Sequence, residues 1–333
     1  MSVAQVLRDS RIKAIHVIHR LDSKQEYLFR DTSVDTQSLQ AFLAVADTQS
    51  FSRAAEQLYL TQPAVSKRIA TLESQVGARL FDRIGRRIAL TEAGNVLLPQ
   101  ARRILFTVED SRRALANLSG QVGGKLTLAT SHHIGLHRLP PLLKQYTQRH
   151  PEVELDLHFL DSEQAYQGVL DGTLEMAVVT LAPHPHEQLQ VVELWRDRLC
   201  FTCAIDHPLA NQDPAPQSLR SLADLCEFNC VMPGAKTFTG SLIAKRFNEA
   251  GLQLPVSMAT NYLETLKMMC SVGLGWSLLP EKMIDSELVE LKVDTPPIYR
   301  PLGYLVHTNR TLSNAARRMI EELENTRRES AIK

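Results

Sequence analysis

The stretch "LTQPAVSKRIATLESQVGARLF", residues 60–81, has the pattern of an exposed helix that begins in a polar turn. Thr61 can cap this helix, and Pro63 falls in its first turn, where a missing backbone N–H does no harm. An inward apolar stripe is spaced at helical intervals: Val65, Ile69 and Leu72. The outward side keeps polar and cationic side chains: Gln62, Ser66, Lys67 and Arg68. The pattern predicts a short amphipathic helix with one surface suited to a polar partner.

The flanking residues extend this helix into a small domain. Apolar residues in the segment 39–46 recur at helical spacing, and a second short helix follows with Ser50 or Ser52 as its cap. Only the residues "YLT" separate that helix from the next, which is typical of a helix-turn-helix. Two β-type runs around Gly85 in "RLFDRIGRRIALT" indicate a hairpin. We therefore predict a winged helix-turn-helix over residues 34–91.

The charge distribution points this domain toward DNA. Lys plus Arg and Asp plus Glu each total 37, so attraction to nucleic acid must come from a local cluster. The segment from Lys67 to Arg87 contains six cationic residues and only two anionic ones. Side chains at the start of a recognition helix can read base edges, while nearby cations and helix N-termini meet phosphates. The expected DNA contacts are Ser52, Arg53, Gln62, Pro63, Ala64, Ser66, Lys67, Arg83, Arg86 and Arg87.

A merely solvated surface would explain the same polar residues in an isolated stretch. The order of three short helices, a basic hairpin and a long helix favours DNA instead. That long helix is expected over residues 92–119, and its apolar positions are spaced alternately by four and three, as in a coiled-coil seam. The seam would join two subunits; packing of the helix on its own domain is the alternative. Its expected dimer contacts are Leu97, Ala101, Ile104, Val108, Leu115 and Leu118, with Ser111 at one position between them.

Residues 124–330 alternate strand-like and helical runs, which predicts parallel β-α-β units. The alternation begins again near residue 196, so two α/β lobes are expected. We assign residues 124–195 and 275–330 to the first lobe and residues 196–274 to the second. The fold class is therefore α/β, preceded by a winged helix-turn-helix and a long linker helix, and a ligand cleft is expected between the lobes.

The region "FLAVADTQSFSRAAEQLYLTQPAVSKRIATLESQVGARLFDRIGRRIALTEAG" resembles the DNA-binding domain of LysR-type transcriptional regulators in residue types and spacing. The later residues are similar in layout to that family's effector domain, which has a periplasmic-binding-protein-like fold. The resemblance covers the chain from about residue 34. It implies base reading by Gln62, Pro63, Ala64, Ser66 and Lys67, and a backbone clamp of wing arginines. Lys67 departs from the arginine that is common at this position in the family.

A small effector is expected in the cleft, because loops after strands and helix N-termini meet there and free N–H groups favour anions. The metabolite is therefore expected to be anionic, such as a carboxylate, although each hydroxyl side chain could instead be a helix cap. The candidate effector contacts are Thr130, Ser131, His132, His133, Thr180, Thr237, Phe238, Thr239, Thr260 and Asn261.

Metal and redox sensing are two alternatives within the same architecture. Five histidines suggest a metal site, because imidazole is a common metal ligand: His132, His133, His137, His184 and His186. No cysteine or carboxylate joins them at regular spacing in the sequence, so we expect no metal and no cofactor. The five cysteines have no disulfide framework, and Cys200 and Cys203 would point to opposite faces of a strand, so buried structural thiols are the favoured interpretation.

The sequence has no apolar run long enough for a bilayer span and no signal-peptide pattern in its first 33 residues, so a cytoplasmic protein without membrane contact is expected. Residues 1–33 are either a short extension, amphipathic or disordered, or a segment upstream of a natural start at Val34.

We predict a sequence-specific regulator that binds a dyad-symmetric site on double-stranded DNA as a dimer of dimers, as members of the resembled family often do. A small effector would change the spacing of its DNA-binding heads, and RNA polymerase is a candidate further partner. An enzyme with a helical oligomerisation domain is a competing class, but no Gly-rich phosphate loop, GxSxG elbow or zinc-ligand spacing supports it. A structural DNA organiser without sequence preference is the third.

Overall fold

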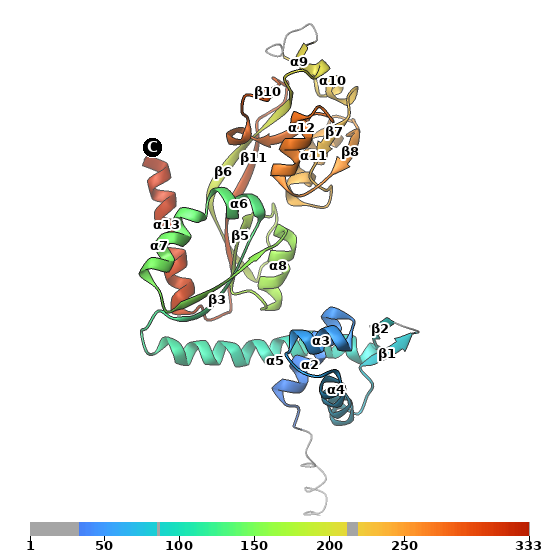
Figure 1. Ribbon diagram of the computed structural model, residues 1–333, viewed down its shortest axis with the longest axis vertical. Coiled ribbons are helices and arrows are strands. Elements are labelled where there is room, and N and C mark those ends of the chain that lie inside the picture. The colour runs from blue at the N-terminus through green and yellow to red at the C-terminus, as the bar shows by residue number, and fades with distance from the viewer. Residues whose placement is uncertain (1–32, 85–86, 212–218, 333) are drawn as a thin grey trace, which may run out of the picture. The chain divides into compact units, whose positions relative to one another are not determined.

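The structure is a computed structural model that describes residues 33–84, 87–211 and 219–332 (Figure 1). The expectations for residues 1–33 therefore concern residues outside the described part, Ser33 excepted. The chain forms two compact units, Met1–Val108 and Glu109–Lys333. In the described residues, no helix is both long enough and apolar enough to cross a membrane.

The first unit is a three-helix domain with a hairpin. Its helices are α2 (Thr36–Thr48), α3 (Phe51–Gln57) and α4 (Gln62–Val76), and its strands are β1 (Phe81–Ile84) and β2 (Arg87–Leu90), which pair antiparallel. The side chains of Asp35, Ser50 and Thr61 each accept a hydrogen bond from a backbone N–H in the first turn of the helix that follows. The predicted cap of α4 is confirmed, and Ser50 rather than Ser52 caps α3. The winged helix-turn-helix is confirmed.

The core of this unit draws on every helix. It includes Phe42 of α2, Ala54 of α3 and Leu72 of α4, all fully buried or nearly so. Helix α5 (Glu92–Asn117) adds to the same core, since Ala101 is fully buried there and Leu97 packs against it. The first part of the expected seam therefore packs within its own chain. Farther along, the apolar side chains of Ile104, Leu115 and Leu118 are exposed.

The first lobe of the second unit contains the strands β3 (Gly124–Thr130), β4 (Val153–Phe159) and β5 (Met176–Thr180). β3 pairs parallel with both β4 and β5, which confirms the expected parallel units. Its helices are α6 (His132–His137), α7 (Pro140–Arg149), α8 (Ser162–Asp171) and α13 (Asn314–Ile332). Alternate strand residues enter two different cores: Leu128 packs with α7 and α13, and Ala129 packs with α8. The sheet is therefore covered on both faces (Figure 1).

The second lobe has its own cores and a small parallel pair of strands. Its elements, in chain order, are α9 (Pro208–Asn211), α10 (Leu222–Cys226), β7 (Cys230–Met232), α11 (Phe238–Glu249), β8 (Val256–Ala259), α12 (Leu263–Ser271), β9 (Ser277–Pro280), η1 (Glu281–Met283) and β10 (Leu288–Glu290). β7 and β8 pair parallel. Trp276 is fully buried between the rings of Phe201 and Phe247. The first lobe buries the other tryptophan, Trp195, with the guanidinium of Arg138 over its ring.

Two long antiparallel strands, β6 (Leu189–Ala204) and β11 (Ile298–His307), run through both lobes. The expected return to the first lobe at residue 275 differs from the structure. β9 and β10 pair with the distal part of β6, and Leu278, Leu291 and Ile298 pack in the core of the second lobe. The chain re-enters the first lobe only along β11, because the apolar side chains of residues 276–298 are buried against second-lobe elements.

The register between β6 and β11 shifts at Leu302/Gly303, and the backbones approach closely there. A Cβ atom on Gly303 would lie 2.0 Å from the carbonyl oxygen of Val192 and 3.0 Å from the Cα of Glu193. Both neighbours are backbone atoms of a paired strand, so neither can move aside cheaply. Only glycine fits at this position.

Gly303→Ala is therefore expected to lower the free energy of unfolding by about 1–3 kcal/mol or more, the cost of overpacking a close contact. Chemical denaturation followed by circular dichroism measures the change. Gly123→Ala is the matched control, because a Cβ there would have its nearest contacts at 3.4 Å, an ordinary van der Waals distance. Equal stability of the two variants would contradict this account of the strand crossing.

Candidate functional site

Helix α4 presents the predicted DNA-reading surface. Gln62, Pro63 and Lys67 are exposed, while Ala64 and Ser66 are half-buried. The Gln62 amide Nε2 donates a hydrogen bond to Ser66 Oγ at 2.8 Å, so the two polar side chains are held together one turn apart. Arg68, which the sequence pattern also placed outward, is half-buried, and its guanidinium donates to Gln37 Oε1 on α2. The outward face of α4 is therefore narrower than expected.

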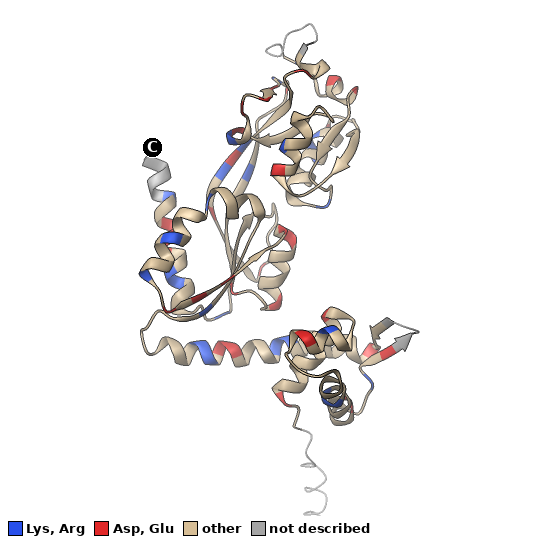
Figure 2. Cartoon of the chain, viewed as in Figure 1, with Lys and Arg blue, Asp and Glu red and all other residues tan. Residues whose placement is uncertain are grey.

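The remaining predicted DNA contacts lie on α3 and the hairpin. Ser52 and Arg53 are exposed in the first turn of α3, and the Arg53 guanidinium donates to the Thr48 carbonyl oxygen at 2.7 Å. Arg83 lies on β1 and Arg87 on β2, and the two strands pair antiparallel. Arg86 lies outside the described residues. Lys and Arg residues on this unit are marked in Figure 2.

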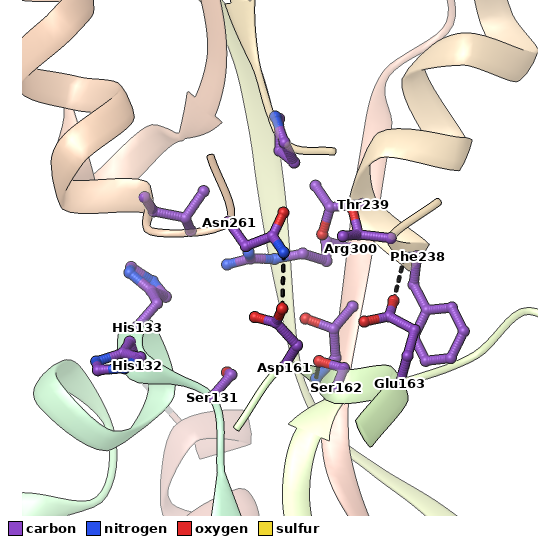
Figure 3. Close-up of a pocket in the computed structure, with 14 residues that line it drawn as sticks. Ser131, His132, His133, Asp161, Ser162, Glu163, Phe238, Thr239, Asn261 and Arg300 are labelled. Carbon is purple, nitrogen blue, oxygen red and sulfur yellow. Dashed lines mark hydrogen bonds between the residues drawn. The ribbon is translucent and has the colours of Figure 1, made fainter. Parts of the chain in front are cut away.

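A small cavity of about 50 Å³ lies between the two lobes of the second unit (Figure 3). Eight of the ten predicted effector contacts line it: Ser131, His132, His133, Thr180, Thr237, Phe238, Thr239 and Asn261. The other two do not. Thr130 is fully buried, with its hydroxyl donating to the Val178 carbonyl, and the Thr260 hydroxyl accepts from the backbone N–H of Tyr262. A metabolite needs a far larger space, roughly 300 Å³ or more.

Hydrogen bonds between the lobes hold this cavity narrow. Glu163, in the first turn of α8, accepts a bond at 2.6 Å from the backbone N–H of Phe238, the first residue of α11. Asn261 Nδ2 donates to Asp161 Oδ2 at 2.7 Å. The Phe238 ring also crosses to the first lobe and packs edge-on against Tyr166. Both polar contacts place a first-lobe carboxylate on a second-lobe donor (Figure 3).

One side of the cavity is formed by Arg300 of β11, which is almost completely buried. Its Nη2 donates to Asp197 Oδ2 at 2.8 Å, and Arg138 donates to Oδ1 of the same carboxylate at 2.6 Å. Burial alone would raise the pKa of Asp197, but the two guanidinium groups outweigh burial and lower it. The Nε of Arg300 is buried and has no hydrogen-bond partner within the described residues.

Glu264, far away in the sequence, joins two of the candidate metal-binding histidines. Its Oε1 lies 3.3 Å from His133 Nδ1 and 2.8 Å from His137 Nε2. No carboxylate accompanies these histidines at regular spacing in the sequence, but Glu264 of the other lobe supplies one in the folded structure. His132 is not in this group, and its ring packs between Phe159 and Tyr262. His184 and His186 are exposed and lie elsewhere.

The cysteines have the character of core residues. The structure describes all five, and none forms a disulfide. Burial raises the pKa of Cys200, Cys203 and Cys230 to about 12, and that of Cys270 to about 11. Since the thiolate is the reactive form, these four thiols are poorly suited to redox sensing.

Six residues that line the cavity were not predicted from the sequence: Asp161, Ser162, Glu163, Pro233, Leu263 and Arg300. Residues 161–163 follow a strand, as Ser131 does, so the same rule applied to β4 would have found them. Arg300 also had a signal, because an arginine within an otherwise apolar strand must have a buried partner or a functional role. Its partner Asp197 lies directly opposite on β6.

Two domain families match the chain. Residues 36–95 match the bacterial regulatory helix-turn-helix protein, lysR family, and residues 119–328 match the LysR substrate binding domain. An uncharacterized HTH-type transcriptional regulator of Azotobacter vinelandii is 69% identical over 108 residues, which are 32% of this chain and 75% of that protein. The probable RuBisCO transcriptional regulator of Cyanophora paradoxa is 31% identical over 86% of this chain and 90% of its own length.

The crystal structure of full-length CbnR complexed with its target DNA has the same fold. The match covers 88% of this chain and 99% of the CbnR chain, with a TM-score of 0.57 and 21% sequence identity. The two domain matches together span both units of the structure. The chain therefore belongs to the LysR family and is a DNA-binding transcriptional regulator that carries an effector-binding domain.

Proposed function

We propose that α4 reads bases in the major groove through Gln62, Pro63, Ala64, Ser66 and Lys67. The Gln62–Ser66 hydrogen bond supports this assignment, because a side chain already held in place loses less conformational entropy when it binds a base. Ser52 and Arg53 on α3 and the wing residues Arg83, Arg86 and Arg87 are assigned to phosphate contacts. The target is a dyad-symmetric site on DNA in the cytoplasm. The protein changes transcription through RNA polymerase as its partner, and it does so without catalysing a reaction.

Gln62→Ala is expected to weaken binding to the specific operator by about 1–3 kcal/mol, because an amide bonded to a base edge discriminates by that amount. Affinity for random duplex DNA, which rests on phosphates, should stay unchanged. Fluorescence anisotropy with both duplexes measures the two affinities. Gln148→Ala, at an exposed position on α7, is the control and should alter neither. An equal loss of affinity for both duplexes would show that Gln62 does not read bases.

We propose that the exposed part of α5 forms the dimer contact, within a dimer of dimers. Ile104 is 44% exposed, Leu115 70% and Leu118 82%, and these apolar side chains continue the seam that Leu97 and Ala101 begin inside their own domain. A row of exposed apolar side chains on one face of a long helix is stabilised by a second helix of the same kind.

The double variant Val108→Lys with Leu115→Lys is expected to dissociate this dimer, because two charges would be buried in an apolar seam. Sedimentation velocity measures the mass. Ala116→Lys serves as the control, since Ala116 is exposed on α5 and lies off the seam. If the double variant sediments like the wild type, the seam is not the dimer contact.

We propose that the effector binds between the lobes and carries an anionic group, such as a carboxylate, that replaces Glu163 at the start of α11. The observation that carries this proposal is the short bond from the Phe238 N–H to the Glu163 carboxylate. Glu163 thus places a carboxylate at a helix N-terminus, where backbone N–H groups favour negative charge. The unpaired Nε of Arg300 supplies a second donor, and Asp161 can accept from hydroxyl or amine groups elsewhere on the same ligand.

The mechanism follows from what the ligand would replace. An effector that takes the place of Glu163 at the Phe238 N–H, and of Asn261 at Asp161, removes two polar contacts between the lobes and supplies its own. It thereby stabilises a wider arrangement of the two lobes, and it shifts the population toward that arrangement by its difference in affinity for the two. We propose that this change alters the geometry of the paired DNA-binding heads and the bend of the operator.

Glu163→Gln tests the charge of the effector. Thermal-shift titration of the full-length chain with a panel of carboxylates, each paired with its neutral amide, identifies a ligand and gives its affinity. Since Gln cannot repel an anion, the variant should bind the carboxylate at least about tenfold more tightly, a change of roughly 1.4 kcal/mol. Glu152→Gln, at an exposed position outside the cavity, is the control. Weaker or unchanged binding to Glu163→Gln would contradict an anionic group at this position.

A further inference from the structure

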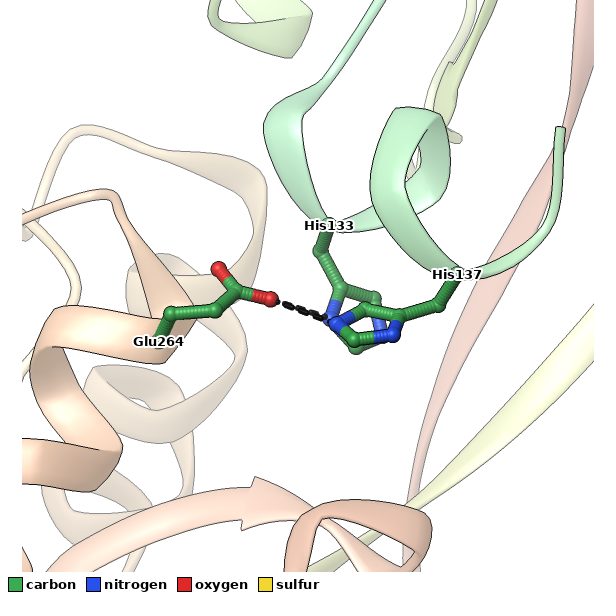
Figure 4. A group of neighbouring side chains, drawn as sticks. All are labelled: His133, His137 and Glu264. Carbon is green, nitrogen blue, oxygen red and sulfur yellow. Dashed lines mark hydrogen bonds and ion pairs between the residues drawn. The ribbon is translucent and has the colours of Figure 1, made fainter. Parts of the chain in front are cut away.

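Three side chains from both lobes converge at the edge of the effector cavity (Figure 4). His133 and His137 lie one turn apart on α6, and Glu264 lies in the first turn of α12 in the second lobe. One ligand atom from each residue lies within 4.8 Å of the other two. Glu264 Oε1 is 3.3 Å from His133 Nδ1 and 2.8 Å from His137 Nε2. The two imidazole nitrogens therefore face a single carboxylate oxygen.

These donors have the chemistry of a zinc site. Zinc commonly binds two imidazoles and one carboxylate, and it keeps a fourth position open for water or another ligand. With bond lengths of about 2.0–2.1 Å, tetrahedral donors lie roughly 3.3 Å apart. The His133–Glu264 distance already has this value. The His137–Glu264 distance is shorter, at 2.8 Å, and the His133 and His137 donors lie within 4.8 Å of each other. The exposed His137 side chain must therefore rotate to bring all three donors around one ion.

The ring of His133 has a carboxylate on each side. Glu264 lies next to its Nδ1. His133 Nε2, on the far side of its ring, lies 3.8 Å from Asp197. A carboxylate that accepts a hydrogen bond from the second ring nitrogen orients histidine ligands in many metal sites, and Asp197 would need to move closer to do so here.

The site is also open to solvent. The side chain of His137 is 51% exposed and that of Glu264 is 35% exposed, whereas His133 is nearly buried. An ion can therefore enter from the side of His137. His133 and Leu263, the neighbour of Glu264, line the effector cavity, so the two sites share a wall.

We propose that His133, His137 and Glu264 bind a zinc ion that connects the two lobes. Zinc would replace the hydrogen bonds to Glu264 with stronger bonds and hold α6 against α12. Binding of the ion does not depend on the assignment of the effector. Its consequence does rest on the proposed function: zinc would favour the narrow cavity and oppose an effector that widens it.

The test uses the full-length chain, stripped of metal with a chelator and then titrated with Zn²⁺ in competition with a chromophoric chelator. One zinc ion is expected per chain. His137→Ala and Glu264→Gln should each weaken binding at least about 100-fold, since loss of a ligand exceeds the roughly 10–100-fold effect of its outer partners. Co²⁺ should give the strong visible absorption of a four-coordinate site in the wild type and lose it in both variants.

His158→Ala is the matched control. His158 is a surface histidine that also faces a carboxylate, with its Nε2 3.0 Å from Asp156, but no third ligand joins them in the described part of the chain. This variant should bind zinc like the wild type. Circular dichroism and affinity for random duplex DNA check that each variant is folded and separate this test from that of the regulator. The proposal would be overturned if the wild type bound no zinc, or if His137→Ala and Glu264→Gln bound zinc as tightly as the wild type.

Discussion

The buried carboxylate of Asp197 is the constraint on which the effector-binding domain depends. It lies on β6 directly opposite Arg300 on β11, at the point where these strands pass between the lobes, and it also accepts from Arg138. Two guanidinium groups cannot be buried here without an anion, and removal of one partner from a buried pair costs about 3–5 kcal/mol. The carboxylate thereby keeps Arg300 at the cavity and faces the ring of His133.

Two hydrogen bonds from second-lobe N–H groups to first-lobe carboxylates hold the two lobes together at the cavity. Phe238 N–H at the start of α11 needs an acceptor once it is removed from water, and Glu163 provides it. Asp161 does the same for the amide of Asn261. An intramolecular carboxylate has a high effective concentration, so an effector must bind with more favourable contacts than the ones it displaces. The proposed carboxylate ligand and the proposed zinc ion act on opposite sides of this competition.

Much of the architecture could be predicted from local patterns. The three helices of the first unit have apolar stripes and caps within a few residues, so hydrophobic spacing and the polar residue at Thr61 were enough to place α4. Parallel β3, β4 and β5 followed from alternation alone. The return from the second lobe could not be placed, because residues 276–298 have short apolar runs that fit either core. Their assignment depends on pairing of β9 and β10 with a strand about eighty residues earlier.

The site shows the same division. Ser131, which directly follows β3, and Thr237, which caps α11, were found because strand ends and helix starts meet at the cleft. Arg300 was missed because its role comes from Asp197 across the sheet, and Glu264 was missed because it meets His137 only after both lobes have folded. A regular spacing in the sequence reveals ligands on one helix, as for His133 and His137. It says nothing about a third ligand that is 127 residues away.

The placement of the two tryptophans gives each lobe its own optical reporter. Trp276 is enclosed by two aromatic rings in the second lobe, whereas Trp195 lies beneath the guanidinium that also holds Asp197. Indole emission depends on nearby charge and on solvent. A rearrangement around Asp197 and Arg138 should therefore change the emission spectrum of Trp195 and leave that of Trp276 constant. If Trp276 is replaced by phenylalanine, Trp195 is the single tryptophan of the protein, and its emission would report movement around Asp197 and Arg300.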